Sequence, residues 1–236
     1  ADGTIRVSGD DARGAMYGGL DVAEAIRLAT LDRVPVGQRR PFIQERGIKF
    51  NIPLDLRTPS YSDNSDAAQA NIPEMWSIDF WRTMLDEMAR HRYNALTLWN
   101  LHPFPSIVQV PEFPEVALDD VLRAKPGSFD ERFSHSGRDM FRPELLDGAE
   151  VVKRLSIRDK IAFWREVMQH ARDRGIDVYW FTWNAFLFGA EGKHGLKRQG
   201  MGEDEVRYFR ASVRETVRMY PLLAGIGITA GEYMDE

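Results

Sequence analysis

The stretch Gly225-Ile-Gly-Ile-Thr-Ala-Gly-Glu232-Tyr233 is a short apolar run that ends in small residues and is followed by a carboxylate. A run of this length, bounded by glycine, is typical of a buried strand of a parallel sheet. Open parallel sheets bind ligands at the carboxyl ends of their strands. We therefore take Glu232 as the candidate catalytic residue, and the alternative is a glutamate in an ordinary exposed loop.

The same pattern of apolar strand, polar loop and amphipathic helix precedes this stretch along the chain. We expect strands at residues 47–52, 95–99, 177–183 and 225–230. The helix before the third strand begins at Ser156, whose spacing to Asp159 predicts a capping box, and Gly175 can end it in the left-handed conformation. Repeated βα units predict an α/β fold with a parallel sheet. We expect residues 41–236 to form the first half, strands one to four, of a (β/α)8 TIM barrel.

The first 40 residues have a different pattern. Residues 4–8 alternate apolar and polar as a half-buried strand does, and a helical face runs from Asp21 to about Leu31. Residues 33–45 have no period and contain Pro35 and Pro41, which is typical of a linker. We expect residues 1–40 to be the C-terminal part of a small α/β domain that precedes the barrel.

The second and third predicted strands end in a shared Trp-Asn pair. A tryptophan offers an apolar face to sugar C–H groups, and an asparagine offers a donor and an acceptor to a hydroxyl. In the alternative interpretation the tryptophans fill layers inside the barrel and the asparagines cap helices. The candidate substrate-binding residues are Asn51, Trp99, Asn100, His102, Trp183 and Asn184.

Composition and motifs exclude several classes of function. The net charge of −5 argues against a nucleic-acid binder, and no apolar run reaches the roughly 18 residues that span a membrane. The five histidines lack metal-site spacing, cysteine is absent, and no phosphate-binding glycine motif follows a strand. We predict no metal, no cofactor, no nucleic-acid partner and no membrane partner.

Two segments carry a resemblance to a family group. The run Ile5-Arg-Val-Ser-Gly-Asp-Asp-Ala-Arg-Gly14-Ala-Met-Tyr17-Gly18 resembles the end of the α/β domain that precedes the barrel in β-hexosaminidases and α-glucuronidases. Arg46-Gly47-Ile-Lys-Phe-Asn51 is similar to the opening of their first barrel strand. The resemblance implies that Glu232, at the end of strand four, is the general acid. Hexosaminidases carry an adjacent Asp-Glu pair, whereas Gly231 precedes Glu232 here.

We therefore predict an α-glucuronidase-like glycoside hydrolase of polysaccharides or oligosaccharides that uses two carboxylates. The alternatives are a catalytically inactive carbohydrate-binding barrel and a β-N-acetylhexosaminidase-like enzyme. The second carboxylate is expected on a later strand, so the chain is expected to be a fragment. Its partners would be the carbohydrate and the remaining half of the barrel, from a later part of the parent chain or a companion chain. We expect a secreted or periplasmic protein whose signal has been removed.

Overall fold

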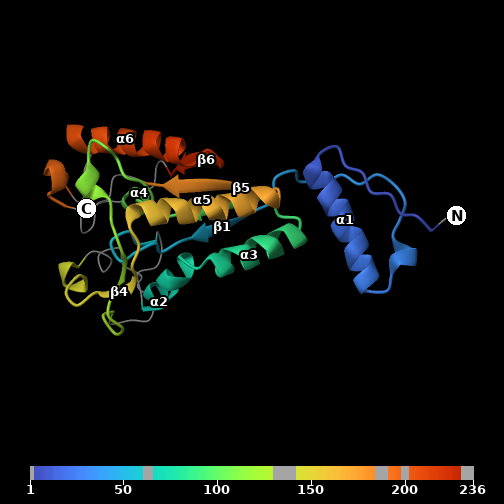
Figure 1. Ribbon diagram of the computed structural model, residues 1–236, viewed down its shortest axis with the longest axis horizontal. Helices are drawn as coiled ribbons and strands as arrows, with labels where there is room; N and C mark the ends of the chain where they lie inside the picture. Colours follow the sequence, from blue (N-terminus) through green and yellow to red (C-terminus); the bar gives the residue numbers. More distant parts are fainter. Residues whose placement is uncertain (1–2, 61–65, 130–141, 184–190, 198–201, 230–236) are drawn as a thin grey trace.

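The structure is a computed structural model that describes residues 3–60, 66–129, 142–183, 191–197 and 202–229. It is a mixed α/β structure built around a parallel sheet (Figure 1). The helices are α1 (Ala12–Arg27), α2 (Asp66–Met75), α3 (Ile78–Arg90), α4 (Phe104–Ile107), α5 (Ile157–Asp173) and α6 (Glu203–Met219). The strands are β1 (Gly47–Asn51), β2 (Ala95–Trp99), β3 (Val121–Arg123), β4 (Glu150–Lys153), β5 (Asp177–Thr182) and β6 (Leu223–Ile228). Short 3-10 helices occupy Leu31–Arg33, Pro114–Val116, Pro143–Leu145 and Lys193–Gly195.

Four strands form the main sheet in the order β1-β2-β5-β6, and every neighbouring pair is parallel. These are the four strands that the sequence predicts, although β6 begins two residues earlier than expected. The order follows the chain without a reversal, so the sheet is singly wound. Because parallel crossovers are right-handed, a singly wound sheet receives its helices on one face, unlike a doubly wound sheet.

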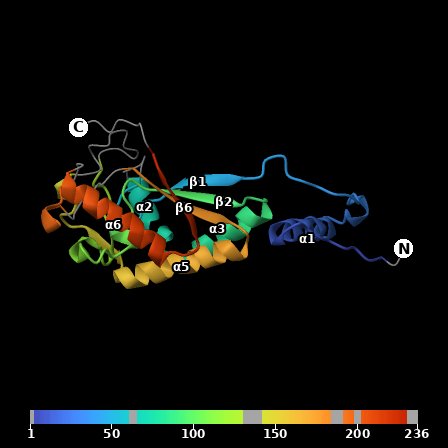
Figure 2. The same cartoon turned by 90° about the horizontal axis from the view of Figure 1, so that it is seen from above.

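Figure 2 shows this one-sided arrangement, with α3, α5 and α6 on the same side of the strands. Ile48, Leu96 and Val178 lie side by side on neighbouring strands and pack in the core on that side. Among the residues that the structure describes, no helix covers the opposite face, which we call the inner face. Parallel sheets are usually covered on both faces, so the open inner face is unusual for a parallel sheet of this size.

An aromatic cluster holds the helices against the sheet. Trp164 of α5 contacts the rings of Trp76, Trp81 and Trp180 edge-on, with ring centroids 5.9, 5.2 and 4.8 Å apart. All four indole rings are buried. Edge-to-face packing of aromatic rings stabilises a core beyond the area that it buries. This cluster packs the sheet against α3 and α5.

The predicted ends of α5 are confirmed. Ser156 and Asp159 form a reciprocal capping box, with the Asp159 backbone N–H donating to the Ser156 hydroxyl over 3.2 Å. Gly175 lies just beyond the helix in the left-handed region, at φ 66°. Both features were readable from sequence because they depend on residues a few positions apart.

The N-terminal segment corrects two expectations. Residues 4–8 form no strand, and α1 begins at Ala12, nine residues before the predicted start. Asp11 caps it by accepting from the Gly14 backbone N–H at 2.6 Å. Figure 1 shows α1 beyond the N-terminal ends of the strands, where Arg13 pairs with Asp177 at 2.6 Å. The division into domains at residue 40 stays a prediction.

The long connection after β2 contains structure that the sequence did not indicate. β3 and β4 pair as an antiparallel ribbon within residues 101–155. A small second cluster of buried Leu56, Ala124, Phe129 and Leu145 lies beside this ribbon. The connection is therefore ordered where the structure describes it, and it flanks the carboxyl ends of the strands.

Candidate functional site

The candidate site lies where the four parallel strands end. Register pairs Asn51 with Trp99 and Trp99 with Phe181, so the ends of β1, β2 and β5 are level with one another. The side chains of Lys49 and Asn51 in β1 alternate with those of the core-facing Ile48 and Phe50, so they point toward the inner face. Half-buried Asn51 therefore stands at the carboxyl edge of the inner face.

Trp99 lies within a layer of stacked side chains. Its ring is parallel to Phe181 of β5, with centroids 4.3 Å apart and planes 5° apart. The Lys49 ammonium of β1 lies 4.2 Å from the Trp99 ring centroid. Because β1 and β5 flank β2, these two groups approach Trp99 from opposite sides. The geometry matches the layer interpretation of Trp99, with neither ring face left for a sugar.

The layer continues onto β6 through a glycine. A Cβ atom on Gly227 would come within 2.1 Å of the Phe181 ring, so the ring rests directly on the Gly227 backbone. Gly225 has the same relation to Tyr179, at 3.3 Å. Glycine here permits close approach of an aromatic ring to the strand. Lys49, Trp99, Phe181 and Gly227 thus form a continuous floor, which we call the aromatic floor, beneath the strand ends.

Asn100 is buried and holds the loops together. Its Nδ2 donates to the carbonyl oxygens of Ile52 at 2.9 Å and Thr58 at 3.0 Å. Its Oδ1 accepts from the backbone N–H of His102 at 3.0 Å. Both amide hydrogens are therefore used within the protein. Asn100 positions the loops after β1 and β2, and it offers no free donor to a sugar in this conformation.

His102 and Trp183 are also buried. The His102 ring packs edge-on against Phe104, with centroids 5.1 Å apart, and at a tilt of 48° against Tyr208 of α6, with centroids 5.7 Å apart. The Trp183 backbone N–H donates to the Leu101 carbonyl at 3.1 Å, at the end of β5. His102 follows the end of β2 and Trp183 follows the end of β5. Asn184 and Glu232 lie outside the described residues.

Thr229 is a site residue that sequence reasoning missed. It follows Gly225 and Gly227 at the spacing of two that places alternate β6 residues on the inner face. Its backbone N–H donates to the Thr182 carbonyl at 3.2 Å. Its hydroxyl is buried and has no hydrogen-bond partner among the residues described. The alternation of the quoted stretch could have indicated it.

A buried carboxylate supports the loop after β1. Asp55 is fully buried and pairs with Arg57, with Nε to Oδ1 at 2.7 Å and Nη2 to Oδ2 at 2.9 Å. It also accepts the backbone N–H of Leu122 in β3 at 2.8 Å. Arg57 in turn donates to the Asp119 carbonyl at 3.0 Å. These bonds join the loop that follows Asn51 to the base of the β3–β4 ribbon.

Lys160 of α5 is a buried cation beside this network. Its ammonium donates to the Leu118 carbonyl at 2.7 Å and to the Asp120 carbonyl, and it lies 5.3 Å from the Trp76 ring centroid. Burial lowers the pKa of Lys160 to about 8, against the opposing effect of Asp55 nearby. The residue fixes the loop before β3 onto α5.

This pKa predicts an alkaline dependence of stability. Above about pH 8 folded Lys160 loses its proton while the unfolded chain retains it up to its usual pKa, so the unfolded state binds more protons. The free energy of unfolding should therefore rise with pH through this window, by a few kcal/mol at most. Buried Tyr208 and Tyr220 have raised pKa values and oppose this above about pH 10. Urea unfolding of wild type and Lys160→Met between pH 7 and 10 measures the difference, and equal slopes would contradict the assignment.

Within residues 3–60, 66–129, 142–183, 191–197 and 202–229, no three His, Cys, Asp or Glu side chains gather in a way that could hold a metal ion. Over the same residues no helix has the length and apolar character that crossing a membrane requires.

Comparison with known proteins gives a structural likeness. No family model and no curated protein matches the sequence. A GH138 enzyme targeting pectin rhamnogalacturonan II is similar in structure, with a TM-score of 0.64 and 22% identity over 95% of this chain. The chain spans 23% of that enzyme's length.

Two further structures are less similar. A GH20 exo-β-N-acetylglucosaminidase from Vibrio harveyi has a TM-score of 0.44 and 11% identity over 82% of this chain and 28% of its own. A β-N-acetylhexosaminidase also has a TM-score of 0.44, with 16% identity over 88% of this chain and 41% of its own. Of these three structures, the GH138 enzyme is the one similar enough to bear on the fold, and it supports the mixed α/β architecture with a parallel sheet.

Proposed function

We propose that the chain is part of a glycoside hydrolase whose site lies above the aromatic floor, at the carboxyl edge of the inner face. The singly wound sheet with an open inner face is the observation that carries this proposal. Such a sheet is half of what a (β/α)8 barrel needs, and enzymes of that fold place their chemistry at the carboxyl ends of the strands. The likeness to a GH138 enzyme supports the same fold.

In the proposed mechanism Glu232 is the general acid. In the sequence it follows the end of β6 by four residues. Hydrolysis of a glycosidic bond needs a protonated carboxyl group at the leaving oxygen and a second carboxylate as base or nucleophile. We assign the second to a later strand of the completed barrel, supplied by the parent chain or a companion chain.

Sugar contacts are assigned to residues that follow or end the strands of the sheet. Asn51, Asn184 and the Thr229 hydroxyl are candidates for hydrogen bonds to sugar hydroxyls, and Trp183, which precedes Asn184 in the sequence, is a candidate for packing against the sugar. Trp99 would not contact the sugar but would hold the aromatic floor in place. Asn100 and His102 would hold the loops that follow the strands. We propose an acidic sugar as substrate, in keeping with the α-glucuronidase-like sequence, and a secreted or periplasmic location where polysaccharides occur.

The inactive carbohydrate-binding barrel remains a second candidate because the aromatic floor and the Asn100 bonds do not depend on Glu232. Such a protein would bind glycans without cleaving them. The β-N-acetylhexosaminidase-like alternative would release N-acetylhexosamine, although Gly231 replaces the aspartate that holds an acetamido group in that family.

The test compares the 236-residue chain with the longest polypeptide that its gene encodes, each incubated with a panel of acidic, neutral and N-acetylated polysaccharides. Release of reducing sugar by the longer polypeptide alone is expected. Retardation in glycan-containing gels without release would favour the binding alternative. Hydrolysis by the chain alone would contradict the half-barrel assignment, and neither binding nor release by either polypeptide would contradict the proposal.

A further inference from the structure

Few charged residues belong to the sheet beneath the candidate site. Of all the residues in β1, β2, β5 and β6, two are charged, Lys49 and Asp177. Asp177 is the first residue of β5, at the amino ends of the strands, where it pairs with Arg13 at 2.6 Å. Lys49 is therefore the one charged residue that these strands contribute to the aromatic floor.

The Lys49 ammonium lies on the inner face, against the second strand. Lys49 is exposed, and its side chain points away from the core-facing Ile48. Its backbone pairs in register with Thr97, but its ammonium lies 4.2 Å from the ring centroid of Trp99, the residue that ends β2. The positive charge therefore belongs to the layer beneath the strand ends, on the same face as the proposed sugar site.

The Trp99 ring that the ammonium contacts is held by its neighbours. Its Nε1–H donates to the Thr97 hydroxyl at 3.2 Å, and that hydroxyl donates to the Ile48 carbonyl at 3.3 Å. Phe181 stacks on the ring from the β5 side. A cation over the face of an indole is attracted by the ring. The ammonium is thus preorganised, so a ligand that binds it loses less affinity to the ordering of a flexible side chain.

We propose that Lys49 binds the carboxylate of an acidic sugar and selects uronic acid units over neutral sugars. The rest of the floor, formed by Trp99, Phe181 and Gly227, carries no charge, so a sugar carboxylate above it meets one cation. An ammonium has three N–H donors, so one bond within the protein leaves two for a ligand. This inference rests on the proposed function, because it names the residue that recognises the acidic substrate at the same site.

The test measures binding of two ligands that differ in charge alone. These are oligogalacturonate and the same oligosaccharide with its carboxylates reduced to hydroxymethyl groups, and oligoglucuronate with its reduced form makes a second pair. The protein is the longest polypeptide that the gene encodes, with Glu232→Gln so that the sugar stays uncleaved. Isothermal titration gives the Kd of each ligand, and the parent should prefer the acidic form of at least one pair.

Lys49→Met should weaken binding of that acidic form about 10- to 100-fold, which corresponds to the 1.5–3 kcal/mol of a hydrogen bond to a charged group. Binding of the reduced form should change less than about twofold, which is under 0.5 kcal/mol. Lys49→Gln is a second uncharged variant with the same expected result. Lys49→Arg should keep most of the preference, because a guanidinium also binds carboxylates. Thermal unfolding checks that each variant folds.

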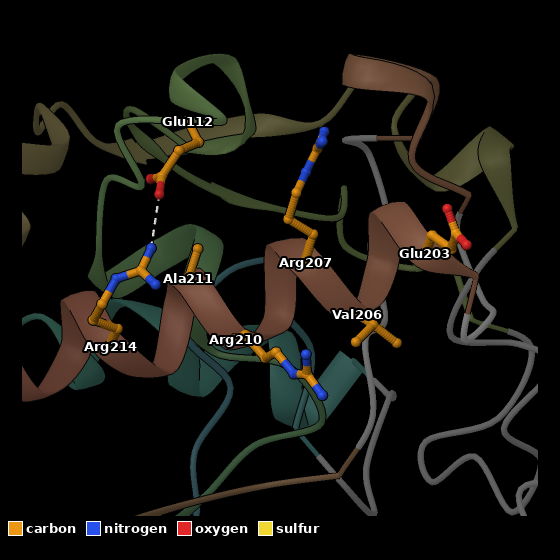
Figure 3. Close-up of a pocket in the computed structure, with 7 residues that line it drawn as sticks. All are labelled: Glu112, Glu203, Val206, Arg207, Arg210, Ala211 and Arg214. Atoms are coloured by element: carbon orange, nitrogen blue, oxygen red, sulfur yellow. Dashed lines mark hydrogen bonds and ion pairs between the residues drawn. The ribbon is translucent and has the colours of Figure 1, made fainter.

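Arg210→Met is the control for the loss of one positive charge. Arg210 lies in a groove of about 700 Å³ on the exposed side of α6 (Figure 3). Arg214 pairs there with Glu112 at 2.7 Å, as the dashed line in Figure 3 marks, and Arg207 pairs with Asp204 at 3.1 Å. Because its charges are largely matched, this groove should not select acidic sugars, and Arg210→Met should change each Kd less than about twofold.

Four results would overturn the inference. These are a preference for the acidic form that survives Lys49→Met and Lys49→Gln, an equal loss of both forms, an equal loss with Arg210→Met, or no preference by the parent in either pair. The outcome is separable from that of the proposed function. Hydrolysis with a preference independent of Lys49 would contradict this inference alone, whereas a preference lost with Lys49 but no hydrolysis by the wild-type longer polypeptide would contradict the proposed function alone.

Discussion

Replacing Glu232 with glutamine should lower kcat for glycoside hydrolysis by about 10²- to 10⁴-fold, the range that general acid catalysis contributes. Glutamine keeps the shape of the side chain but carries no transferable proton. Substrate affinity should therefore change little, and the loss should appear in kcat.

The leaving group distinguishes an acid from a merely structural glutamate. An aryl glycoside with an acidic phenol departs without a proton, so Glu232→Gln should affect it far less than an alkyl glycoside. Glu236→Gln is the matched control, since it is the same substitution four residues further along the chain. Wild-type rates for Glu232→Gln on both substrates would contradict the assignment of Glu232 as the general acid.

The second large effect concerns stability. Asp55→Ala should lower the free energy of unfolding by about 3–5 kcal/mol, because it leaves a largely buried guanidinium without its carboxylate. The Leu122 backbone N–H also loses its acceptor. Asp55→Asn keeps an acceptor oxygen and should cost less.

Urea unfolding measures these losses, and a surface pair provides the comparison. Glu166 bonds Arg82 at 2.8 Å, but both side chains are about half exposed, at 52% and 49%. Glu166→Ala should therefore cost less than about 1 kcal/mol. A loss for Asp55→Ala as small as that for Glu166→Ala would show that the Asp55 network does not hold the loop.

Local sequence signals predicted much of the fold. β2 has the predicted bounds, and the α5 caps agree, because alternation, helical periodicity and capping depend on neighbouring residues. The predicted start of α1 was wrong because Gly14, Gly18 and Gly19 lower helix propensity across the first turns of this helix. β3 and β4 were missed because strands of three and four residues carry little periodicity.

The roles of individual site residues depend on contacts that the sequence does not contain. Trp99 ends β2 and Trp183 directly follows the neighbouring strand β5, as the sequence predicts. However, the Trp99 ring meets Phe181 and Lys49 from the flanking strands, and the Asn100 amide meets carbonyls more than 40 positions away. Asp55 and Lys160 were also not singled out, because an isolated Asp or Lys in sequence gives no sign of burial. The prediction for Glu232 stays open to experiment.

The most direct test is a crystal structure of the longer polypeptide carrying Glu232→Gln, soaked with an acidic oligosaccharide. The account predicts an uncleaved sugar above the aromatic floor, with its glycosidic oxygen about 3 Å from the side chain at position 232. A sugar bound at the N-terminal ends of the strands, or at the carboxyl edge with position 232 out of reach, would contradict it.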